Sequence, residues 1–152
     1  MKVVLIRHIK SDWSNSVSDF DRPIRNDRKT DAKRISDALK AIGIAPEKII
    51  ASPAKRTRQT ALLFANAFHY SSSNIEYAAP LYESTSEELF AFIQGLDKAF
   101  TCVFIICHNP SVTDFINSYT NGKIDHVPTC GCAVLDAVDD KFSICGFYYP
   151  KK

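Results

Sequence analysis

The sequence predicts an α/β protein, a three-layer sandwich in which helices cover both faces of a mostly parallel central sheet. Two observations carry this prediction. Short apolar segments of β-type composition alternate with longer segments whose apolar residues recur at helical spacing. The segment at 102–107 is apolar throughout, which is typical of a strand at the centre of a sheet covered on both faces. The 152 residues fit one domain over 1–152.

The order of the expected elements is strand then helix, repeated, with a hairpin at the end. Strands are expected at 2–7, 48–51, 75–77, 102–107, 132–138 and 142–148, and helices at about 32–42, 53–67, 86–96 and 110–122. Gly43 can end the first helix. Ser52-Pro53 is a start signal for the second, with Ser52 as cap and Pro53 in the first turn. The last two strands flank Asp139-Asp140-Lys141, which predicts an antiparallel hairpin.

Composition excludes several classes of protein. Hydrophobic residues make up 45% and charged residues 24% of the chain, as in ordinary globular proteins. A net charge of +2 is too weak to argue for a nucleic-acid partner, although the cluster at 25–29 could bind anions. No apolar run approaches the ~18 residues that cross a bilayer. The chain enters a strand at residue 2 and lacks the pattern of a signal peptide, so we expect a cytoplasmic protein.

The cysteines argue for free thiols. Their number, five, is odd, and a reducing compartment disfavours a disulfide framework. Cys107-His108 together with Cys130-Gly131-Cys132 lacks the paired spacing of a structural zinc site. We therefore expect no metal.

Polar groups cluster where the expected strands end. Arg7-His8 follows the first strand, the Ser-Pro segment with Arg56 follows the second, and His108-Asn109 follows the central one. Ligands of open α/β sheets bind outside the carboxyl ends of the strands, so these groups can converge on one pocket. Two arginines, two histidines and nearby helix N-termini suit a tetrahedral dianion such as phosphate.

These residues also resemble the motifs of a known family. Residues 5–11, Leu-Ile-Arg-His-Ile-Lys-Ser, resemble the Arg-His-Gly signature of the histidine phosphatase superfamily. Asp21-Arg22-Pro23-Ile24, the segment 52–60 and Cys107-His108-Asn109-Pro110 resemble its later motifs in the same order. The match is greatest to the short SixA-type branch, the bacterial phosphohistidine phosphatases, and it spans nearly the whole chain. It implies a phosphoglycerate mutase-like fold.

The resemblance also implies a mechanism without metal or cofactor. His8 would attack phosphorus in line and form a phosphohistidine that water then hydrolyses. Its imidazole must be neutral, and its second nitrogen should donate to a backbone carbonyl. Arg7, Arg56 and His108 would hold the non-bridging oxygens, and Asn109 is assigned to the phosphate site with them.

Some assignments have competing interpretations. Glu83 follows the Leu-x pattern of the general acid in larger relatives, but it is equally well explained as a surface carboxylate. Ile9 stands in place of the signature glycine, so the loop after His8 should keep ordinary backbone angles. Arg28 falls near a second family glycine. His69 and His126 match no motif and are expected to be structural or surface residues.

The short intervals between motifs leave no room for a substantial lid. An open site favours phosphohistidine on a signalling protein as the substrate, with Trp13 and Phe20 either contacting that partner or packing against the chain. Two alternatives are a phosphatase for small phosphomonoesters or sugar phosphates, and a non-catalytic phosphate-binding module. We expect a monomer with no membrane or nucleic-acid partner.

Overall fold

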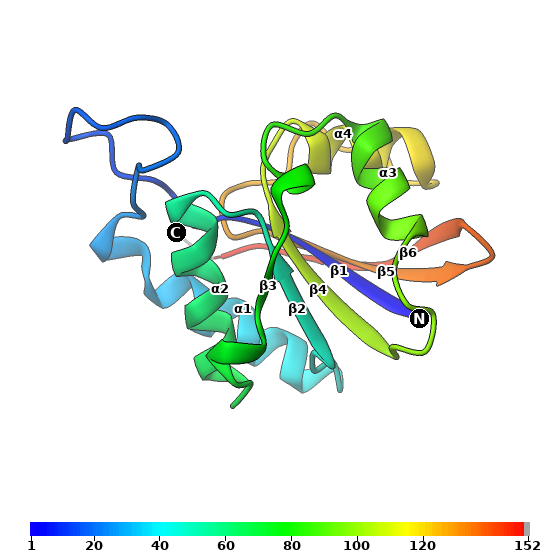
Figure 1. The fold of residues 1–152 in the computed structure, drawn as a ribbon. Coiled ribbons are helices and arrows are strands. Elements are labelled where there is room, and N and C mark those ends of the chain that lie inside the picture. Colours follow the sequence, from blue (N-terminus) through cyan, green and yellow to red (C-terminus); the bar gives the residue numbers. More distant parts are fainter. Residues whose placement is uncertain (151–152) are drawn as a thin grey trace.

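The computed structural model describes residues 1–150, and within them the expected alternation of strands and helices is present (Figure 1). The strands are β1 (Lys2–Arg7), β2 (Lys48–Ala51), β3 (Glu76–Tyr77), β4 (Cys102–Cys107), β5 (Cys132–Val138) and β6 (Lys141–Tyr148). The α-helices are α1 (Thr30–Ala41), α2 (Lys55–Ala67), α3 (Ser86–Gln94) and α4 (Ser111–Tyr119). Short 3-10 turns lie at Asn26–Arg28, Ser72–Asn74 and Ala79–Leu81.

The strands form one six-stranded sheet in the order β3-β2-β4-β1-β5-β6. Its first four strands run parallel, whereas β5 is antiparallel to β1 and β6 is antiparallel to β5. β1 and β4 pair along their full length, from Lys2 opposite Cys102 to Arg7 opposite Cys107. The predicted α/β class, the mostly parallel sheet and the terminal hairpin are confirmed.

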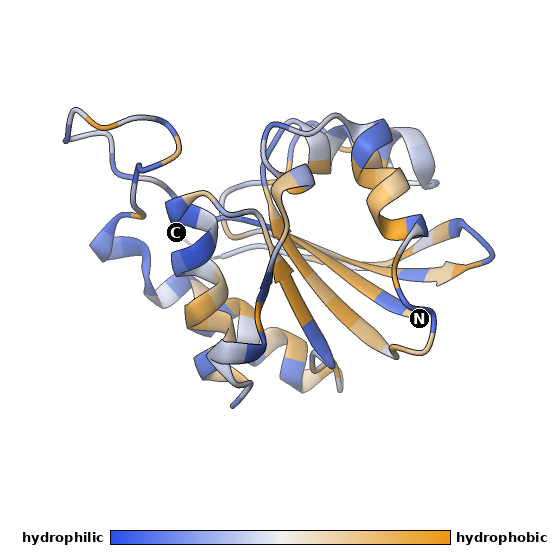
Figure 2. Cartoon of the chain, in the orientation of Figure 1, coloured by the Kyte–Doolittle hydropathy of each residue, from blue (hydrophilic) through white to orange (hydrophobic). Residues whose placement is uncertain are grey.

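The two faces of the sheet bury two separate cores. Val4 and Ile6 of β1 pack with apolar residues of α1 and α2, whereas Val3 and Leu5 pack with apolar residues of α3 and α4. Side chains alternate between the faces of a strand, which is why the uninterrupted apolar run of β1 serves both layers. Figure 2 shows the sheet as mostly apolar and the outer surfaces of the helices as mostly polar. Both faces of the central strands are therefore buried, and the parallel pairing of β1 with β4 brings their carboxyl ends to the same side of the sheet.

One predicted helix boundary is wrong. α2 begins at Lys55 with Ala54 as its N-cap residue, and no side chain caps it. Ser52, the expected cap, instead places its hydroxyl 2.8 Å from Nε2 of His108. The backbone is still extended at Ala54, which has ψ of 147°, so the helix begins only at Lys55, two residues too late for Ser52 to cap it. Ser52 therefore belongs to the polar edge of the sheet.

Smaller differences occur in the second half. α4 ends at Tyr119, before the expected Gly122, where the hydroxyl of Thr120 donates to the carbonyl of Ile116 at 2.6 Å. Lys141 lies in β6, and the hairpin turn is made by Asp139 and Asp140, both with positive φ. Gly43 has φ of 78° just after α1, as its expected role at that helix end requires.

The five cysteines are free thiols. Four of them are buried and only Cys145 is exposed; burial raises the pKa of Cys102 to about 11 and that of Cys107 to about 12. Within residues 1–150 no group of three metal-ligating side chains is found. No helix among those residues is long and apolar enough to cross a membrane.

Candidate active site

The backbone of Arg7 and His8 is held firmly at the carboxyl end of β1. The amide of Arg7 donates to the carbonyl of Gly131 at 3.0 Å and the amide of His8 to that of Cys107 at 3.1 Å. The Cys130 amide donates to both carbonyls, Arg7 and His8, at 3.0 Å. A Cβ on Gly131 would lie 2.8 Å from the Pro128 carbonyl oxygen, so only glycine allows this close approach. The backbone of Arg7 and His8 is thus held between β4 and the segment that leads into β5.

The imidazole of His8 is oriented by its own chain neighbour. His8 is only 7% exposed, and its Nδ1 lies 2.7 Å from the carbonyl oxygen of Ile9. A carbonyl only accepts hydrogen bonds, so Nδ1 carries the proton and Nε2 keeps its lone pair. Among the described residues no hydrogen bond to Nε2 is found. This is the geometry that the proposed nucleophile requires.

Ile9 fits this site without special backbone angles. Its side chain is fully buried in the core beside α1 and α2, and its φ is not positive. The amide of Ile9 donates to the hydroxyl of Thr60 at 3.0 Å, and that hydroxyl donates to the carbonyl of Arg56 at 2.8 Å. The replacement of glycine by isoleucine therefore adds core packing and leaves the loop geometry ordinary, as the sequence predicts.

His108 faces His8 across the edge of the sheet. The two ring centroids are 5.4 Å apart, and the His108 ring also lies edge-on to that of Tyr82 at 5.7 Å. Burial, helped by the neighbouring positive groups, lowers the pKa of His8 to about 3. Burial and Arg56 lower that of His108 to about 4. Both imidazoles are therefore neutral at physiological pH.

Arg56 enters the site from the first turn of α2. It is 6% exposed, and its Nη1 donates to the backbone carbonyl of Asp19 at 2.6 Å. Its Nη2 lies 3.2 Å from the carboxylate Oδ2 of the same residue. The structure thus brings Arg7, His8, Arg56 and His108 to one edge, because β1, β4 and α2 all present their polar ends there (Figure 1).

Three further residues join this group that the sequence alone does not assign to the site. Arg22 is 8% exposed and donates from Nη1 to Oδ1 of Asp19 at 2.9 Å, and Tyr82 donates its hydroxyl to Oδ2 of Asp19 at 2.6 Å. Arg22 stands inside the Asp21-Arg22-Pro23 motif, which was a usable signal. Asp19 and Tyr82 lie in a loop and after a 3-10 turn, where no spacing rule points to the site.

Arg7 and Asn109 share one acceptor. Nη1 of Arg7 and Nδ2 of Asn109 each donate to the carbonyl of Val127 at 3.0 Å. The amide oxygen of Asn109 accepts from the hydroxyl of Thr113 at 3.0 Å and from its backbone amide at 3.3 Å. Because both ends of the Asn109 amide are engaged with the protein, its geometry fits a positioning residue better than a phosphate ligand.

Several buried side-chain nitrogen atoms in this group have no hydrogen-bond partner among the described residues. They are Nε of Arg7, Nε of Arg56 and Nδ1 of His108, and the one other such side-chain atom is Oγ of Ser36. Unpaired buried polar atoms are rare in cores. Their concentration here indicates a binding site for an anion, which would accept hydrogen bonds from the two guanidinium Nε–H groups.

Other candidate residues have no hydrogen bond or ion pair to this cluster among the described residues. Glu83 is exposed, with φ of 56°. The basic cluster at 25–29 is largely neutralised, because Arg25 pairs with Asp27 at 2.5 Å and Arg28 with Asp31 at 2.8 Å. The exposed imidazoles of His69 and His126 take no part in the site.

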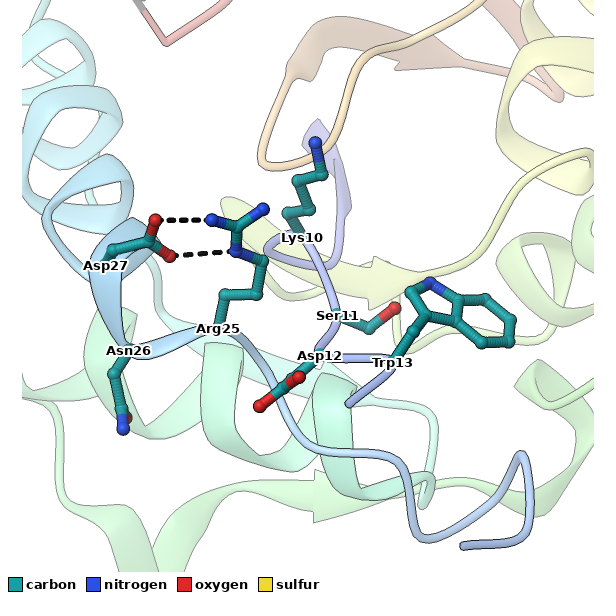
Figure 3. Close-up of a pocket in the computed structure, with 7 residues that line it drawn as sticks. All are labelled: Lys10, Ser11, Asp12, Trp13, Arg25, Asn26 and Asp27. Carbon is teal, nitrogen blue, oxygen red and sulfur yellow. Dashed lines mark hydrogen bonds and ion pairs between the residues drawn. The ribbon is translucent and has the colours of Figure 1, made fainter. Parts of the chain in front are cut away.

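A hollow of about 430 Å³ lies beside the site, along the loop that follows His8 (Figure 3). Its walls include Lys10, Trp13 and Arg25, and Figure 3 shows the Arg25 guanidinium turned toward Asp27. Trp13 is 75% exposed, although the guanidinium of Arg22 lies 3.6 Å from its ring centroid. The indole therefore covers one face of the Arg22 guanidinium, which is also paired with Asp19.

Comparison with known proteins assigns the family. Residues 3–85, more than half of the chain, match the model of the histidine phosphatase superfamily (branch 1). The chain belongs to that superfamily. An uncharacterised chloroplastic protein of Arabidopsis thaliana is 25% identical over 158 residues, which cover 95% of this chain and 72% of the relative.

Solved structures define the branch. A protein of Agrobacterium tumefaciens assigned as phosphohistidine phosphatase SixA has a TM-score of 0.85 at 27% identity, covering 98% of this chain and 97% of its own. The protein histidine phosphatase SixA complexed with tungstate has a TM-score of 0.88 at 20% identity, covering 99% and 97%. Phosphoglycerate mutase from Thermus thermophilus shares the fold, with a TM-score of 0.71 at 17% identity, covering 99% and 100%. The chain is therefore a phosphatase of the SixA type with a phosphoglycerate mutase-like fold.

Proposed function

We propose that this protein removes phosphoryl groups through a transient phosphohistidine on His8. The observation that carries the proposal is the pairing of Nδ1 of His8 with the carbonyl of Ile9 at 2.7 Å. This pairing leaves Nε2 unprotonated beside three groups of the anion site, Arg7, Arg56 and His108. A nucleophile needs that free lone pair, and arginines around it favour the neutral ring.

The reaction runs in two displacements. Nε2 of His8 forms a bond to phosphorus while the bond from phosphorus to the leaving nitrogen or oxygen breaks, and the electron pair of that bond goes to the leaving group, which takes up a proton. Water then attacks phosphorus, the bond from Nε2 to phosphorus breaks, and inorganic phosphate leaves. Arg7 and Arg56 offset the charge on the non-bridging oxygens in both steps, which is the main task of a protein in phosphoryl transfer.

The substrate that we propose is a phosphohistidine displayed on a signalling protein. The connections around the site are short, and the loop after His8 exposes Trp13, Val17 and Phe20 beside it. Exposed apolar side chains at a site's rim suit a protein surface. A phosphorylated imidazole also leaves more readily than an alkoxide, so a site without a buried carboxylic acid is adequate for it.

The decisive experiment is to trap the covalent intermediate. Wild-type protein is mixed with a radiolabelled phosphodonor, quenched in alkali, and compared with His8→Ala and, as a matched control, His69→Ala. Label should appear on wild type and on His69→Ala and be absent from His8→Ala. Equal labelling of His8→Ala would contradict the proposed nucleophile, and no labelling of any protein would favour the binding-module alternative.

A second comparison addresses the substrate. Dephosphorylation of a phosphohistidine-bearing phosphotransfer domain is measured beside that of p-nitrophenyl phosphate and a sugar phosphate, under one set of conditions. The proposal requires a larger kcat/KM for the phosphohistidine protein. A larger value for a small ester would assign the protein to the phosphomonoesterases instead.

A further inference from the structure

Asp19 occupies the cationic part of the proposed active site. Its Oδ1 lies 2.9 Å from Nη1 of Arg22, and its Oδ2 lies 3.2 Å from Nη2 of Arg56 and 2.6 Å from the hydroxyl of Tyr82. The carboxylate therefore accepts hydrogen bonds from two arginines that are each less than a tenth exposed. No other carboxylate of the described chain is paired with either arginine.

These contacts place a negative charge where a phosphoryl group would bind. Nη2 of Arg56 carries two N–H groups, and the one that faces Oδ2 of Asp19 at 3.2 Å is available to a phosphate oxygen only when the carboxylate leaves. Two anions on one guanidinium repel each other at such distances. The Asp19 side chain is 49% exposed, so its carboxylate can rotate away from the arginines into solvent.

The loop that carries Asp19 has other attachments that do not depend on the carboxylate. Nη1 of Arg56 donates to the backbone carbonyl of Asp19 at 2.6 Å, and the amide of Lys55 donates to the carbonyl of Phe20 at 2.9 Å. Nε of Arg22 donates to the hydroxyl of Ser11 at 3.0 Å. Rotation of one side chain can therefore free the arginines while the loop backbone stays in place.

We propose that Asp19 is an exchangeable internal anion, which the substrate phosphoryl group displaces on binding and which returns to Arg22 and Arg56 to drive product phosphate out. This inference rests on the proposed function of the site. Asp19 acts through the arginines and is therefore a positioning residue. Its expected effect is to weaken the binding of phosphate, because part of the attraction of the arginines is already used.

The test measures the affinity of inorganic phosphate by calorimetry at about pH 8, where phosphate groups carry close to two charges. Asp19→Asn keeps the size and the backbone contact but removes the charge. We expect phosphate to bind Asp19→Asn about tenfold more tightly than wild type, since hydrogen bonds to charged groups are about twice as strong as neutral ones. Asp21 lies on the same loop, and among the described residues its carboxylate is hydrogen-bonded only to Ser18, so the phosphate affinity of Asp21→Asn should stay within about twofold of wild type.

A purely structural role for Asp19 gives the opposite result, because loosened arginines bind phosphate more weakly. Tyr82→Phe provides a second test that keeps Asp19 in place but removes its 2.6 Å hydrogen bond. It should also tighten phosphate binding, by a smaller factor. In steady-state assays, both variants should show a lower inhibition constant for phosphate, and kcat should fall where product release limits the rate.

The outcomes separate the two levels of the argument. If wild type binds phosphate and neither Asp19→Asn nor Tyr82→Phe binds it more tightly, the proposed role of Asp19 is overturned and the proposed phosphatase site stays intact. Failure of phosphate to bind any of the four proteins overturns the anion site and, with it, this inference. Weaker binding in Asp19→Asn, with unchanged binding in Asp21→Asn, assigns Asp19 a structural role only.

Discussion

Nδ1 of His8 lies 2.7 Å from the carbonyl oxygen of Ile9, the next residue in the chain. The tautomer of the proposed nucleophile is therefore set by local backbone geometry, with no partner from a distant element. The same short segment is fixed on its other side, where the amide of Ile9 donates to Thr60 on α2. The side chain of Ile9, which stands in place of the family glycine, is fully buried in the core on the side of α1 and α2.

The two active-site imidazoles should remain neutral down to about pH 5. Burial lowers the pKa of His8 to about 3 and that of His108 to about 4. We expect ¹⁵N chemical shifts of both rings to be constant from about pH 8 to about pH 5 in the unliganded protein. A titration midpoint near the ordinary histidine value of about 6.5 for either ring would contradict this expectation.

The same shifts predict the direction of the pH dependence of stability. Below about pH 6.5 the unfolded chain binds protons at these two histidines, and the folded protein does not. The free energy of unfolding should therefore fall as the pH is lowered from about 6.5 towards 4. Urea unfolding of wild type and of His8→Gln across this pH range checks this prediction. The free energy of unfolding of the variant should depend less steeply on pH, because one of the two histidines is absent.

Thr60 links the backbone of the nucleophile to that of Arg56. Its hydroxyl accepts from the amide of Ile9 at 3.0 Å and donates to the carbonyl of Arg56 at 2.8 Å. Thr60→Val should leave the Ile9 amide unpaired in the core and lower the free energy of unfolding by about 1–3 kcal/mol. The phosphatase rate should fall as well, because the loop after His8 loses its tie to α2.

Thr120→Val is the matched control. The Thr120 hydroxyl also bridges two backbone groups, donating to Ile116 at 2.6 Å and accepting from Gly122 at 3.0 Å, but it lies at the end of α4 away from the site. Thr120→Val should lower the free energy of unfolding but leave the phosphatase rate nearly unchanged. Equal losses of rate in the two variants would show that Thr60 acts only through global stability.

Much of the fold could be predicted from sequence because the apolar pattern changes period at each element. β4 is apolar throughout, β1 is apolar between Lys2 and Arg7, and each helix shows one apolar stripe. The prediction failed at helix ends, where tertiary contacts compete with local signals. Ser52 has the composition of a cap, but its hydroxyl lies beside His108, 56 positions away.

The candidate site was predictable to the extent that its residues follow strands. Arg7, His8 and His108 stand directly at strand ends, and the structure brings them together with Arg56. Asp19 and Tyr82 could not be predicted, since their contact joins residues 63 positions apart from irregular segments. Composition and spacing carry no information about such a pair.

Glu83 is a test of the general-acid hypothesis. The residue is exposed, and among the described residues no hydrogen bond or ion pair joins its carboxylate to the two histidines or the arginines. A general acid typically contributes about 10²–10⁴-fold to rate. We expect Glu83→Gln to change kcat for phosphohistidine protein by less than about threefold. A loss of about a hundredfold or more with p-nitrophenyl phosphate would instead assign Glu83 as the acid for esters.

Asn109 should act on the reaction through Arg7. Both side chains donate to the carbonyl of Val127 at 3.0 Å, and Asn109 also holds Thr113. Asn109→Ala removes one of the two bonds that position this carbonyl, so Arg7 loses its fixed orientation. We expect the free energy of unfolding to fall by about 1–2 kcal/mol and kcat/KM to fall by about tenfold or more.

Asn117, on the helix α4 that follows Asn109, offers a control for the loss of stability. Asn117 clamps the segment before Val127 in the same way, since its side chain donates to and accepts from the backbone of Ile124 at 2.9 Å. Asn117→Ala should destabilise the protein to a similar degree but leave kcat/KM within about twofold of wild type, because Arg7 keeps its acceptor. If Asn117→Ala lowers kcat/KM as much as Asn109→Ala does, the shared acceptor has no special effect on Arg7. Phosphate affinity separates the two cases further, because only a displaced Arg7 weakens it.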